Sequence, residues 1–253
     1  MNQNRNIIFL LSMLALIFIL TACRNNDDLN GNNIDSANGT QMIFCGASDP
    51  ENATVLSEEE ALSYLALVNR CYRVASDFSP EDLSVVNVES VRGPHDDHHL
   101  LRESAARATE ALFQAALEDD FSLVAASGYR SYDLQTFYHN HAIDSWGLEE
   151  ARRRSAIPGH SEHQLGLALD LTISELGYEL VPIFSETSAG RWVNEQAHRF
   201  GFIVSFPDGR EAETSIVYEP WHIRYVGVDV ATEIFYANQI LEEFLWHSNA
   251  FME

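Results

Sequence analysis

The segment SEHQLGLALD (161–170) combines metal-binding side chains with a hydrophobic alternation. From Leu165 to Leu171, leucine alternates with small or polar residues, which predicts a β-strand with one face in the core. Asp170 falls on the opposite face, where a metal or a substrate can approach. His163 precedes the alternation, in a loop that can turn back toward the same pocket. Because imidazole and carboxylate both bind zinc, we interpret His163 and Asp170 as candidate ligands.

A third candidate ligand lies in the segment EPWH (219–222). With His222, the chain offers two histidines and one carboxylate, a set that leaves one position of a catalytic zinc site open for water. Zinc polarises this water, and a nearby carboxylate that is not a ligand can take its proton, a role that we assign to Glu219. Pro220 has no N–H and predicts an edge strand or a strand end, with Trp221 at the pocket wall.

A guanidinium follows a buried, strand-like stretch, in the segment SGYRS (127–131). Arginine binds a carboxylate through two parallel hydrogen bonds in a fixed geometry, so Arg130 is suited to hold the free carboxylate at the end of a peptide. Gln135 lies one helical turn further along and is expected to add an amide contact. These residues predict recognition of a peptide terminus.

Each feature has an ordinary explanation when it stands alone. A His–Asp pair seven residues apart is common outside metal sites. Arg130 is compatible with a surface ion pair, and Glu219 with a solvated acid at a strand end. Their joint presence in one chain favours zinc-dependent hydrolysis of a peptide bond close to a free carboxylate.

Three segments, SGYRSYxxQ, PGHSEHQLGLALD and YEPWHIRYVG, together resemble the VanY-type D-alanyl-D-alanine carboxypeptidases. This family is related to the VanX-type dipeptidases and the L,D-carboxypeptidases. The resemblance runs from about Ser57 to Leu245, with all motifs in order. It implies a small α+β domain with an antiparallel sheet flanked by helices, the fold of hedgehog and D,D-peptidase domains.

The resemblance also implies roles for residues at the matching positions. The family's zinc ligands correspond to His163, Asp170 and His222. The catalytic base corresponds to Glu219, and the arginine that binds and polarises the substrate's end corresponds to Arg130. Ser161 is a candidate for a hydrogen bond to the substrate. The implied reaction removes the C-terminal D-alanine from peptidoglycan stem peptides.

Two other functions are compatible with the same motifs. An L,D-carboxypeptidase would remove the last D-alanine from a tetrapeptide stem, after a residue with an L-centre. A non-catalytic, zinc-stabilised wall-binding module on the same fold is the second alternative, and the intact Glu219 beside a complete ligand set argues against it.

The elements that must position these residues alternate between helices and short strands, without a regular βαβ rhythm, which favours an α+β fold. Ser57 and Glu60 have the spacing of a helix-capping box before apolar positions that continue to Val68. The other expected helices span about 101–117, 132–146, 148–155, 191–200 and 228–245. Strands are expected at 84–91, in the stretch before Gly128, from Leu165 onward, and within 215–227.

The composition limits the partners. The 253 residues include 15 basic and 38 acidic residues, a formal net charge of −23. Nucleic-acid binding requires clustered cations, so this charge argues against it. A solvated surface is the ordinary reading of such acidity. The chain beyond its N-terminal segments is long enough for one buried domain, which we assign to residues 42–253, and a monomer is expected.

The N-terminus has the layout of a lipoprotein signal peptide at residues 1–22. One basic residue, Arg5, precedes an apolar run that is shorter than a membrane-spanning helix requires. LTAC (20–23) resembles a lipobox, in which Cys23 would carry diacylglycerol and anchor the protein on the outer face of the cell membrane. Residues 23–41 are then a lipidated cysteine and a flexible tether. An ordinary signal peptide or a plain anchor helix remains the alternative.

Two features are left open or assigned to the surface. Cys45 and Cys71 could form a disulfide outside the cytoplasm, with two unpaired buried thiols as the alternative. The histidine-rich run HDDHH (95–99) follows Gly93-Pro94 and precedes a helix. It is interpreted as a solvated loop with an acidic helix start.

Overall fold

The computed structural model describes residues 33–34, 41–42, 45, 48–93 and 96–248. Its α-helices are α1 Glu58–Leu62, α2 Glu103–Glu118, α3 Tyr132–Trp146, α4 Leu148–Arg154, α5 Ser188–Gln196, α6 Glu211–Thr214, α7 Val228–Ala237 and α8 Leu241–His247. Its 3-10 helices are η2 Pro50–Asn52, η3 Asp97–His99, η4 Glu162–Leu165, η5 Ser174–Leu176, η6 Pro182–Glu186 and η7 Ala197–Phe200.

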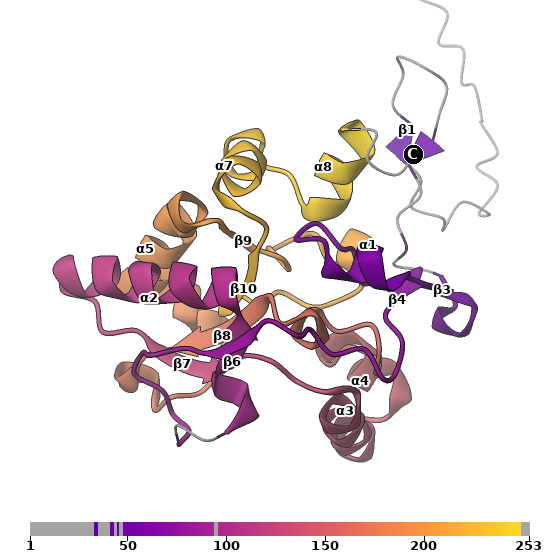
Figure 1. Cartoon of the computed structure of the whole chain (residues 1–253), viewed down its shortest axis with the longest axis horizontal. Coiled ribbons are helices and arrows are strands. Elements are labelled where there is room, and N and C mark those ends of the chain that lie inside the picture. The colour runs from indigo at the N-terminus through magenta and orange to yellow at the C-terminus, as the bar shows by residue number, and fades with distance from the viewer. Residues whose placement is uncertain (1–32, 35–40, 43–44, 46–47, 94–95, 249–253) are drawn as a thin grey trace, which may run out of the picture. The chain divides into compact units, whose positions relative to one another are not determined.

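The strands are β1 Asn33–Ile34, β2 Gln41–Met42, β3 Thr54–Val55, β4 Tyr72–Arg73, β5 Leu83–Val85, β6 Leu100–Arg102, β7 Val124–Ser127, β8 Ala168–Thr172, β9 Phe202–Val204 and β10 His222–Tyr225. Four of them form the main sheet in the order β7-β8-β10-β9, with every neighbouring pair antiparallel. This confirms the predicted α+β fold with a small antiparallel sheet. In Figure 1, α2, α5 and α7 lie on one side of the sheet, and α3 and α4 on the other.

Strand β8 divides the sheet into a packing face and a polar face. Leu169 and Leu171 are 1% and 0% exposed and belong to the same hydrophobic cluster as Leu112 of α2 and Val193 of α5. Because side chains alternate along a strand, Asp170 points to the other face, as the leucine alternation predicted. The core therefore fixes the direction in which the carboxylate projects.

The pairing of β10 with β8 extends this polar face. His222 lies opposite Asp170 and Ile223 opposite Leu169. Cross-strand partners share a face of the sheet, so His222 joins Asp170 while Ile223, 0% exposed, enters the core. The core and the polar site are thus built from alternate residues of the same two strands.

Several predicted elements are shorter than expected. Ser57 and Glu60 form the predicted capping box, yet α1 ends at Leu62 and the chain does not continue as a helix to Val68. The helix expected at 228–245 is two helices, because Asn238 takes a left-handed conformation that ends α7. The strand expected at 84–91 is confined to β5, and the strand expected within 215–227 to β10. Strand β9 was not predicted.

Part of the segment predicted as a tether pairs in the structure. Strands β1 and β2 form an antiparallel ladder of two residue pairs. The predicted signal peptide (1–22) and lipidated Cys23 lie outside the described residues. Among the helices that the structure describes, none combines the length and apolar character needed to cross a membrane.

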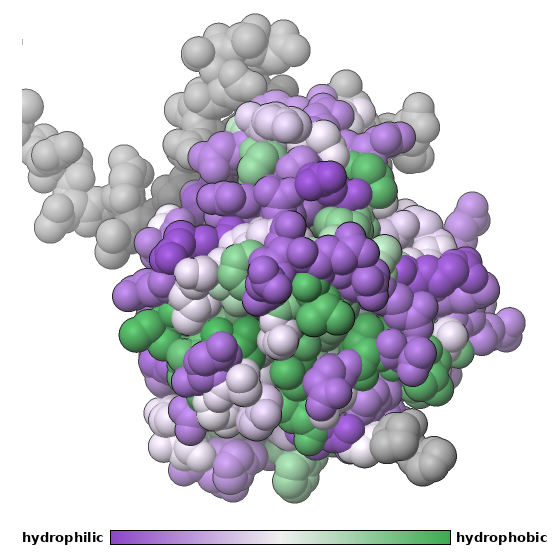
Figure 2. Space-filling model, turned by 90° about the vertical axis from the view of Figure 1, so that its left-hand side faces the viewer, coloured by the Kyte–Doolittle hydropathy of each residue, from purple (hydrophilic) through white to green (hydrophobic). Residues whose placement is uncertain are grey.

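The surface seen in Figure 2 is mixed. Hydrophobic residues appear there as patches interleaved with hydrophilic ones. Over the described residues as a whole, the exposed large hydrophobic side chains include Phe137, Trp146 and Tyr236, from helices α3 and α7. Single exposed apolar residues of this kind are ordinary on a folded domain.

A disulfide joins Cys45 to Cys71, with 5.5 Å between the Cα atoms, and settles the alternative left open by the sequence. The bond ties the start of the domain to the end of the segment that precedes β4. Cys71 also follows directly on Asn69 and Arg70, which line the pocket described below. The bridge therefore restrains one pocket wall.

Replacing both Cys45 and Cys71 with serine is expected to lower the free energy of unfolding by about 2–4 kcal/mol, because the unfolded chain loses a loop constraint. Urea unfolding, followed by fluorescence, measures the difference. As a control, reducing agent should destabilise the wild type and leave the double variant unchanged. Equal unfolding midpoints for the two proteins under oxidising conditions would contradict the expectation.

Candidate metal centre and active site

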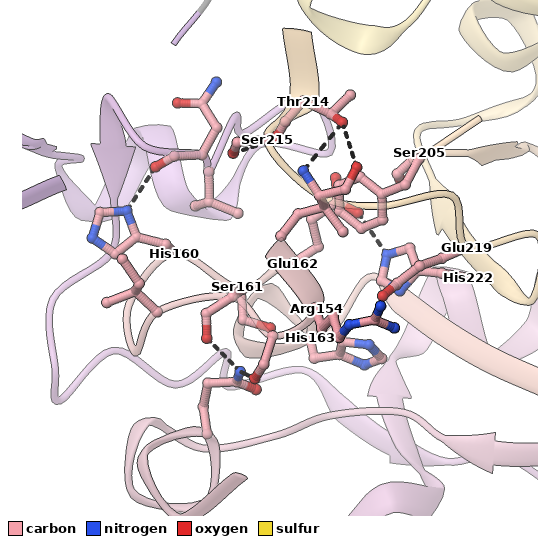
Figure 3. A pocket seen from close by; sticks show the side chains of 18 of the residues that line it. Arg154, His160, Ser161, Glu162, His163, Ser205, Thr214, Ser215, Glu219 and His222 are labelled. Atoms are coloured by element: carbon pink, nitrogen blue, oxygen red, sulfur yellow. Dashed lines mark hydrogen bonds and ion pairs between the residues drawn. The ribbon is translucent and has the colours of Figure 1, made fainter. Parts of the chain in front are cut away.

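A pocket opens on the polar face of the main sheet (Figure 3). The sequence-predicted site residues all line it, although they come from three separate segments of the chain. They are Arg130, Gln135, Ser161, His163, Asp170, Glu219 and His222. Trp221 also lines the pocket, as predicted.

His163, Asp170 and His222 place one potential ligand atom each within 4.8 Å of one another. Nε2 of His163 lies 3.3 Å from one carboxylate oxygen of Asp170, and Nδ1 of His222 lies 3.0 Å from the other. All three side chains are buried, at 1%, 5% and 3% exposure. Two imidazoles that converge on one carboxylate in a buried setting have the donor set and spacing of a zinc site.

Gly128 orients the ring of His163. Its carbonyl accepts a hydrogen bond from Nδ1 of His163 at 2.7 Å, which leaves Nε2 as the ring nitrogen that faces Asp170. Nε2 has no hydrogen-bond partner among the described residues although it is buried. A Cβ on Gly128 would lie 2.6 Å from the carbonyl oxygen of Leu100, so only glycine fits here. A buried ring nitrogen that faces a carboxylate and has no hydrogen-bond partner among the described residues fits the role of a metal ligand.

Glu162 orients the second imidazole. Its carboxylate lies 2.8 Å from Nε2 of His222, so a proton on Nε2 leaves Nδ1 free to bind a metal. Arg224, which is 0% exposed, lies 3.3 Å from the other oxygen of Glu162. Arg224 also donates to the backbone carbonyls of Tyr64 and Ala66. A buried carboxylate–imidazole pair is therefore held in place by a buried guanidinium.

The pKa values in this metal-free site follow from burial and pairing. Burial lowers the pKa of His163 to about 4, and the charge of Arg130 acts in the same direction. For Glu162 burial acts upward, but Arg224 and His222 outweigh it and lower the pKa to about 2. For His222 burial acts downward, but hydrogen bonds to Asp170 and Glu162 raise the pKa to about 10. Without a metal, these interactions keep Glu162 ionised and His222 protonated near neutral pH.

Glu219 is the carboxylate of the pocket that differs most from this pattern. Burial raises its pKa to about 8, helped by the negative charges of Asp170 and Glu162. No ion pair within 4.0 Å involves Glu219 among the described residues. In Figure 3 its side chain lies next to His222 at one side of the pocket. Such a carboxylate is a stronger base than an ordinary glutamate.

Arg130 lies beside the candidate ligands. Its guanidinium is 3.7 Å from Asp170, and its backbone N–H donates to the carbonyl of His163 at 3.2 Å. The guanidinium also lies over the ring of Tyr138, 5.8 Å from the centroid. Nε2 of His98 is 3.1 Å from the hydroxyl of Tyr138, so the face on which Arg130 rests is itself held in place.

The interpretation of residues 95–99 as a solvated loop is wrong for His98 and His99, which are each 6% exposed. The side chain of Asp96 caps η3 and accepts from the backbone N–H of His98, which turns the two imidazoles inward. His98 then pairs with Asp96 and Tyr138, while His99 lies 2.9 Å from the carbonyl oxygen of Arg92. His95 lies outside the described residues.

Ser161 and Gln135, the two residues predicted to contact the substrate beside Arg130, both line the pocket. Ser161 is buried and lines it, and Figure 3 shows its side chain at the cavity. The amide nitrogen of Gln135 donates to the carbonyl of Ala156 at 2.7 Å, so it holds the neighbouring loop. The amide oxygen has no partner among the described residues and is the atom that remains for a ligand.

Sequence reasoning missed Glu162 and Arg224. The sequence offered a clue to both positions. Glu162 adjoins His163, and Arg224 follows His222 by two residues and so lies on the same face of a strand. The contact of Tyr138 with Arg130 could not be predicted from the sequence, because it depends on how α3 packs.

Comparison with known proteins places the chain in a family. Residues 98–228 match the family model described as VanY, D-alanyl-D-alanine carboxypeptidase. YodJ of Bacillus subtilis is 36% identical over 213 residues, which span 84% of this chain and 72% of that protein. VanXYC of Enterococcus gallinarum, a bifunctional D-Ala-D-Ala dipeptidase and carboxypeptidase, is 32% identical over 187 residues, 72% of this chain and 94% of that one.

Solved structures agree with this placement. The LdcB LD-carboxypeptidase is 36% identical with a TM-score of 0.69, covering 85% of this chain and 93% of its own. A VanY variant in complex with Zn(II) is 29% identical with a TM-score of 0.61, covering 72% and 98%. VanYB in complex with D-alanine-D-alanine is 30% identical with a TM-score of 0.61, covering 72% and 97%. The chain therefore belongs to the VanY family of D-alanyl-D-alanine carboxypeptidases.

Proposed function

We propose that this protein is a zinc-dependent carboxypeptidase that removes the C-terminal D-alanine from peptidoglycan stem peptides ending in D-Ala-D-Ala. The observation that carries the proposal is the pocket itself, in which His163, Asp170 and His222 converge beside an unpaired glutamate and an arginine. Family membership and the Zn(II) and D-Ala-D-Ala complexes of related structures support it.

Each residue of the pocket has a separate role in the proposed reaction. His163, Asp170 and His222 hold zinc, which when bound polarises the scissile carbonyl and makes water at the site more acidic. Glu219 takes a proton from the attacking water and passes it to the amine of the departing D-alanine. Arg130 binds the terminal carboxylate of the substrate and stabilises the negative charge that develops at the carbonyl.

A second candidate function has a specific observation in its favour. Among the structural comparisons above, the LdcB LD-carboxypeptidase has the higher TM-score, and it covers more of this chain. An L,D-carboxypeptidase would cut the bond after an L-centre in a tetrapeptide stem. The zinc and base residues are the same in both reactions, so the choice depends on how the pocket receives the residue before the cut bond.

Incubation with purified pentapeptide and tetrapeptide stems, followed by mass spectrometry, tests the proposal. We expect loss of one D-alanine from the pentapeptide, and no cleavage after treatment with a chelator, because the ligand set would be empty. Cleavage of the tetrapeptide alone would assign the protein to the L,D-carboxypeptidases. Cleavage of neither peptide by zinc-loaded protein would reject both activities and favour a wall-binding module.

We also propose that the protein acts at the outer face of the cell membrane, anchored by lipid on Cys23. The support is the layout of residues 1–23, with its short apolar run and LTAC segment. Cys23→Ser is expected to move the protein from the membrane fraction to the soluble extracytoplasmic fraction, as measured by immunoblotting. Cys71→Ser serves as the matched control and should stay membrane-bound. Membrane retention of the Cys23 variant would reject the lipid anchor.

A further inference from the structure

The guanidinium of Arg130 has few contacts that fix its orientation. Its Nε is buried and has no hydrogen-bond partner among the described residues, and its one ion pair with them is the 3.7 Å contact with Asp170. Asp170 is also a candidate metal ligand, so its negative charge is shared between two roles. The unused N–H donors of Arg130 suit a carboxylate of the substrate, but another contact must fix the plane in which they lie.

The ring of Tyr138 provides such a contact. Cζ of the Arg130 guanidinium lies 5.8 Å from the centroid of this ring. An aromatic face attracts a guanidinium through the quadrupole of the ring and uses none of its N–H donors. Tyr138 therefore holds the guanidinium of Arg130 and leaves its donors to a ligand.

The hydroxyl of Tyr138 is in turn held by two residues from outside α3. Nε2 of His98 lies 3.1 Å from this hydroxyl, and Nη2 of Arg92 donates to it at 3.4 Å. The rings of His98 and Tyr138 meet edge to face, with their centroids 6.0 Å apart. Tyr138 is thus fixed at its hydroxyl as well as through its place in α3.

Asp96 decides which ring nitrogen of His98 faces Tyr138. Its carboxylate pairs with Nδ1 of His98 and also accepts from the backbone N–H of His98 at 3.0 Å. Burial lowers the pKa of His98, so the ring is neutral near neutral pH. A neutral imidazole that donates from Nδ1 accepts at Nε2, so the hydroxyl of Tyr138 donates to His98. This hydrogen bond places more negative charge on the phenol that faces Arg130.

We propose that His98, oriented by Asp96, is a positioning residue: it fixes Tyr138, and through Tyr138 the guanidinium that binds the terminal carboxylate of the substrate. The inference rests on the proposed function, which assigns this carboxylate to Arg130. His98 does not line the pocket, and none of the side-chain contacts that the structure gives it involves a candidate metal ligand. Its backbone carbonyl accepts from Gly128 at 2.7 Å, a bond that a side-chain substitution leaves in place.

Two amide substitutions separate this role from a purely structural one. The amide of asparagine lies near the position of Nδ1, so His98→Asn keeps a partner for Asp96 and loses the bond to Tyr138. The longer glutamine places its amide near the position of Nε2, so His98→Gln keeps an acceptor for Tyr138 and loses the partner of Asp96. On the pentapeptide stem, we expect His98→Asn to lower kcat/KM by about 5–20-fold, mainly through KM, and His98→Gln to stay within about 3-fold of wild type. Equal losses, or the reverse order, would show that His98 only anchors η3 and would overturn the proposal.

A double-mutant cycle with Arg130→Gln tests whether His98 acts through Arg130. Once the guanidinium is absent, adding His98→Asn should change kcat/KM by less than about 2-fold, because nothing remains to be positioned. A loss of the same size with and without the guanidinium would indicate a weakened fold and would also overturn the proposal. His141→Asn, at an exposed histidine of α3 outside the pocket, is the control and should match wild type.

Nuclear magnetic resonance of the zinc-loaded protein follows the guanidinium without turnover. The Nε–H signal of Arg130, assigned by its absence in Arg130→Gln, should be shifted by the ring current of Tyr138. We expect His98→Gln to keep this shift and His98→Asn to lose it. If wild type cleaves no stem peptide while this pattern is observed, the proposed function fails and the positioning of Arg130 stands. If wild type is active and both His98 variants keep the shift, the positioning role fails and the function stands.

Discussion

Glu219→Gln is expected to lower kcat by about 10³-fold or more while the protein keeps its zinc, because general acid–base catalysis contributes about 10²–10⁴-fold. The substitution preserves size and removes only the carboxylate that accepts the proton. The position of this segment does not depend on the carboxylate, because the backbone N–H of Glu219 donates a hydrogen bond to the carbonyl of Phe206. The fold and the ligand set should therefore stay intact.

The two buried glutamates of the pocket differ in their suitability for the proposed role of base. Glu162 is paired with Arg224, its pKa is lowered to about 2, and it is correspondingly a weak base. Glu219 lacks such a partner, and burial raises its pKa to about 8. Hydrolysis of the pentapeptide stem and zinc content by mass spectrometry measure the two expectations. Glu186→Gln, an exposed glutamate outside the pocket, is the control. Turnover within a few-fold of wild type in Glu219→Gln would assign the base elsewhere.

The same variant should also alter the pH dependence of stability in the zinc-free protein. The folded pKa of Glu219 is raised above the ordinary value of 4.5. Between pH 4.5 and about 8, the folded state therefore holds a proton that the unfolded chain has released, and stability falls as pH rises. In Glu219→Gln this contribution is absent, so the variant should gain stability relative to wild type as pH increases through this range. Urea unfolding at a series of pH values measures the difference.

Asp170→Asn is expected to abolish tight zinc binding and, with it, activity. The carboxylate lies between the two imidazoles and is the only anionic member of the ligand set that the described residues offer. Asparagine keeps the shape but presents a neutral oxygen and an N–H group, neither of which compensates a divalent cation. We expect the zinc affinity to fall by more than the roughly 100-fold upper value typical of residues that only orient ligands.

Glu162→Gln provides the graded comparison, because Glu162 touches His222 and not the metal position itself. A loss of about 10–100-fold in zinc affinity is expected there. Competition with a chromophoric chelator measures both variants, and circular dichroism checks that the zinc-free proteins are folded. Asp229→Asn, in the exposed first turn of α7, is the control. Wild-type affinity in a folded Asp170→Asn protein would exclude the His163–Asp170–His222 site.

The sequence predicted the parts of the site that are set by local pattern. Leucine alternation placed Asp170 on the polar face because a strand has a period of two, and β8 has this period from Ala168 onward. The strand does not extend back to Leu165 as predicted, because Leu165 ends the 3-10 helix η4. The segment EPWH was predicted at a strand end, and His222 begins β10 with Glu219 three residues before it. Arg130 was predicted after a buried strand and lies three residues beyond the end of β7. These predictions needed no knowledge of which strands are neighbours.

Features that depend on tertiary packing could not be predicted in this way. The pairing of Arg224 with Glu162 joins residues 62 positions apart through the contact of η4 with the sheet. The inward turn of His98 and His99 depends on a cap by Asp96 and on the position of Tyr138, so composition alone suggested a solvated loop.

The register between β8 and β10 links the metal centre to the stability of the core. Sliding β10 by one residue would place Ile223 opposite Asp170 and turn His222 and Arg224 toward the packed leucines. A slip by one residue would therefore remove His222, a candidate metal ligand, from the site and place the Arg224 guanidinium against apolar side chains, so this form would lose both the site and stability. Correct pairing of β10 with β8 therefore brings Asp170 and His222, two of the three candidate metal ligands, together in the same step of folding.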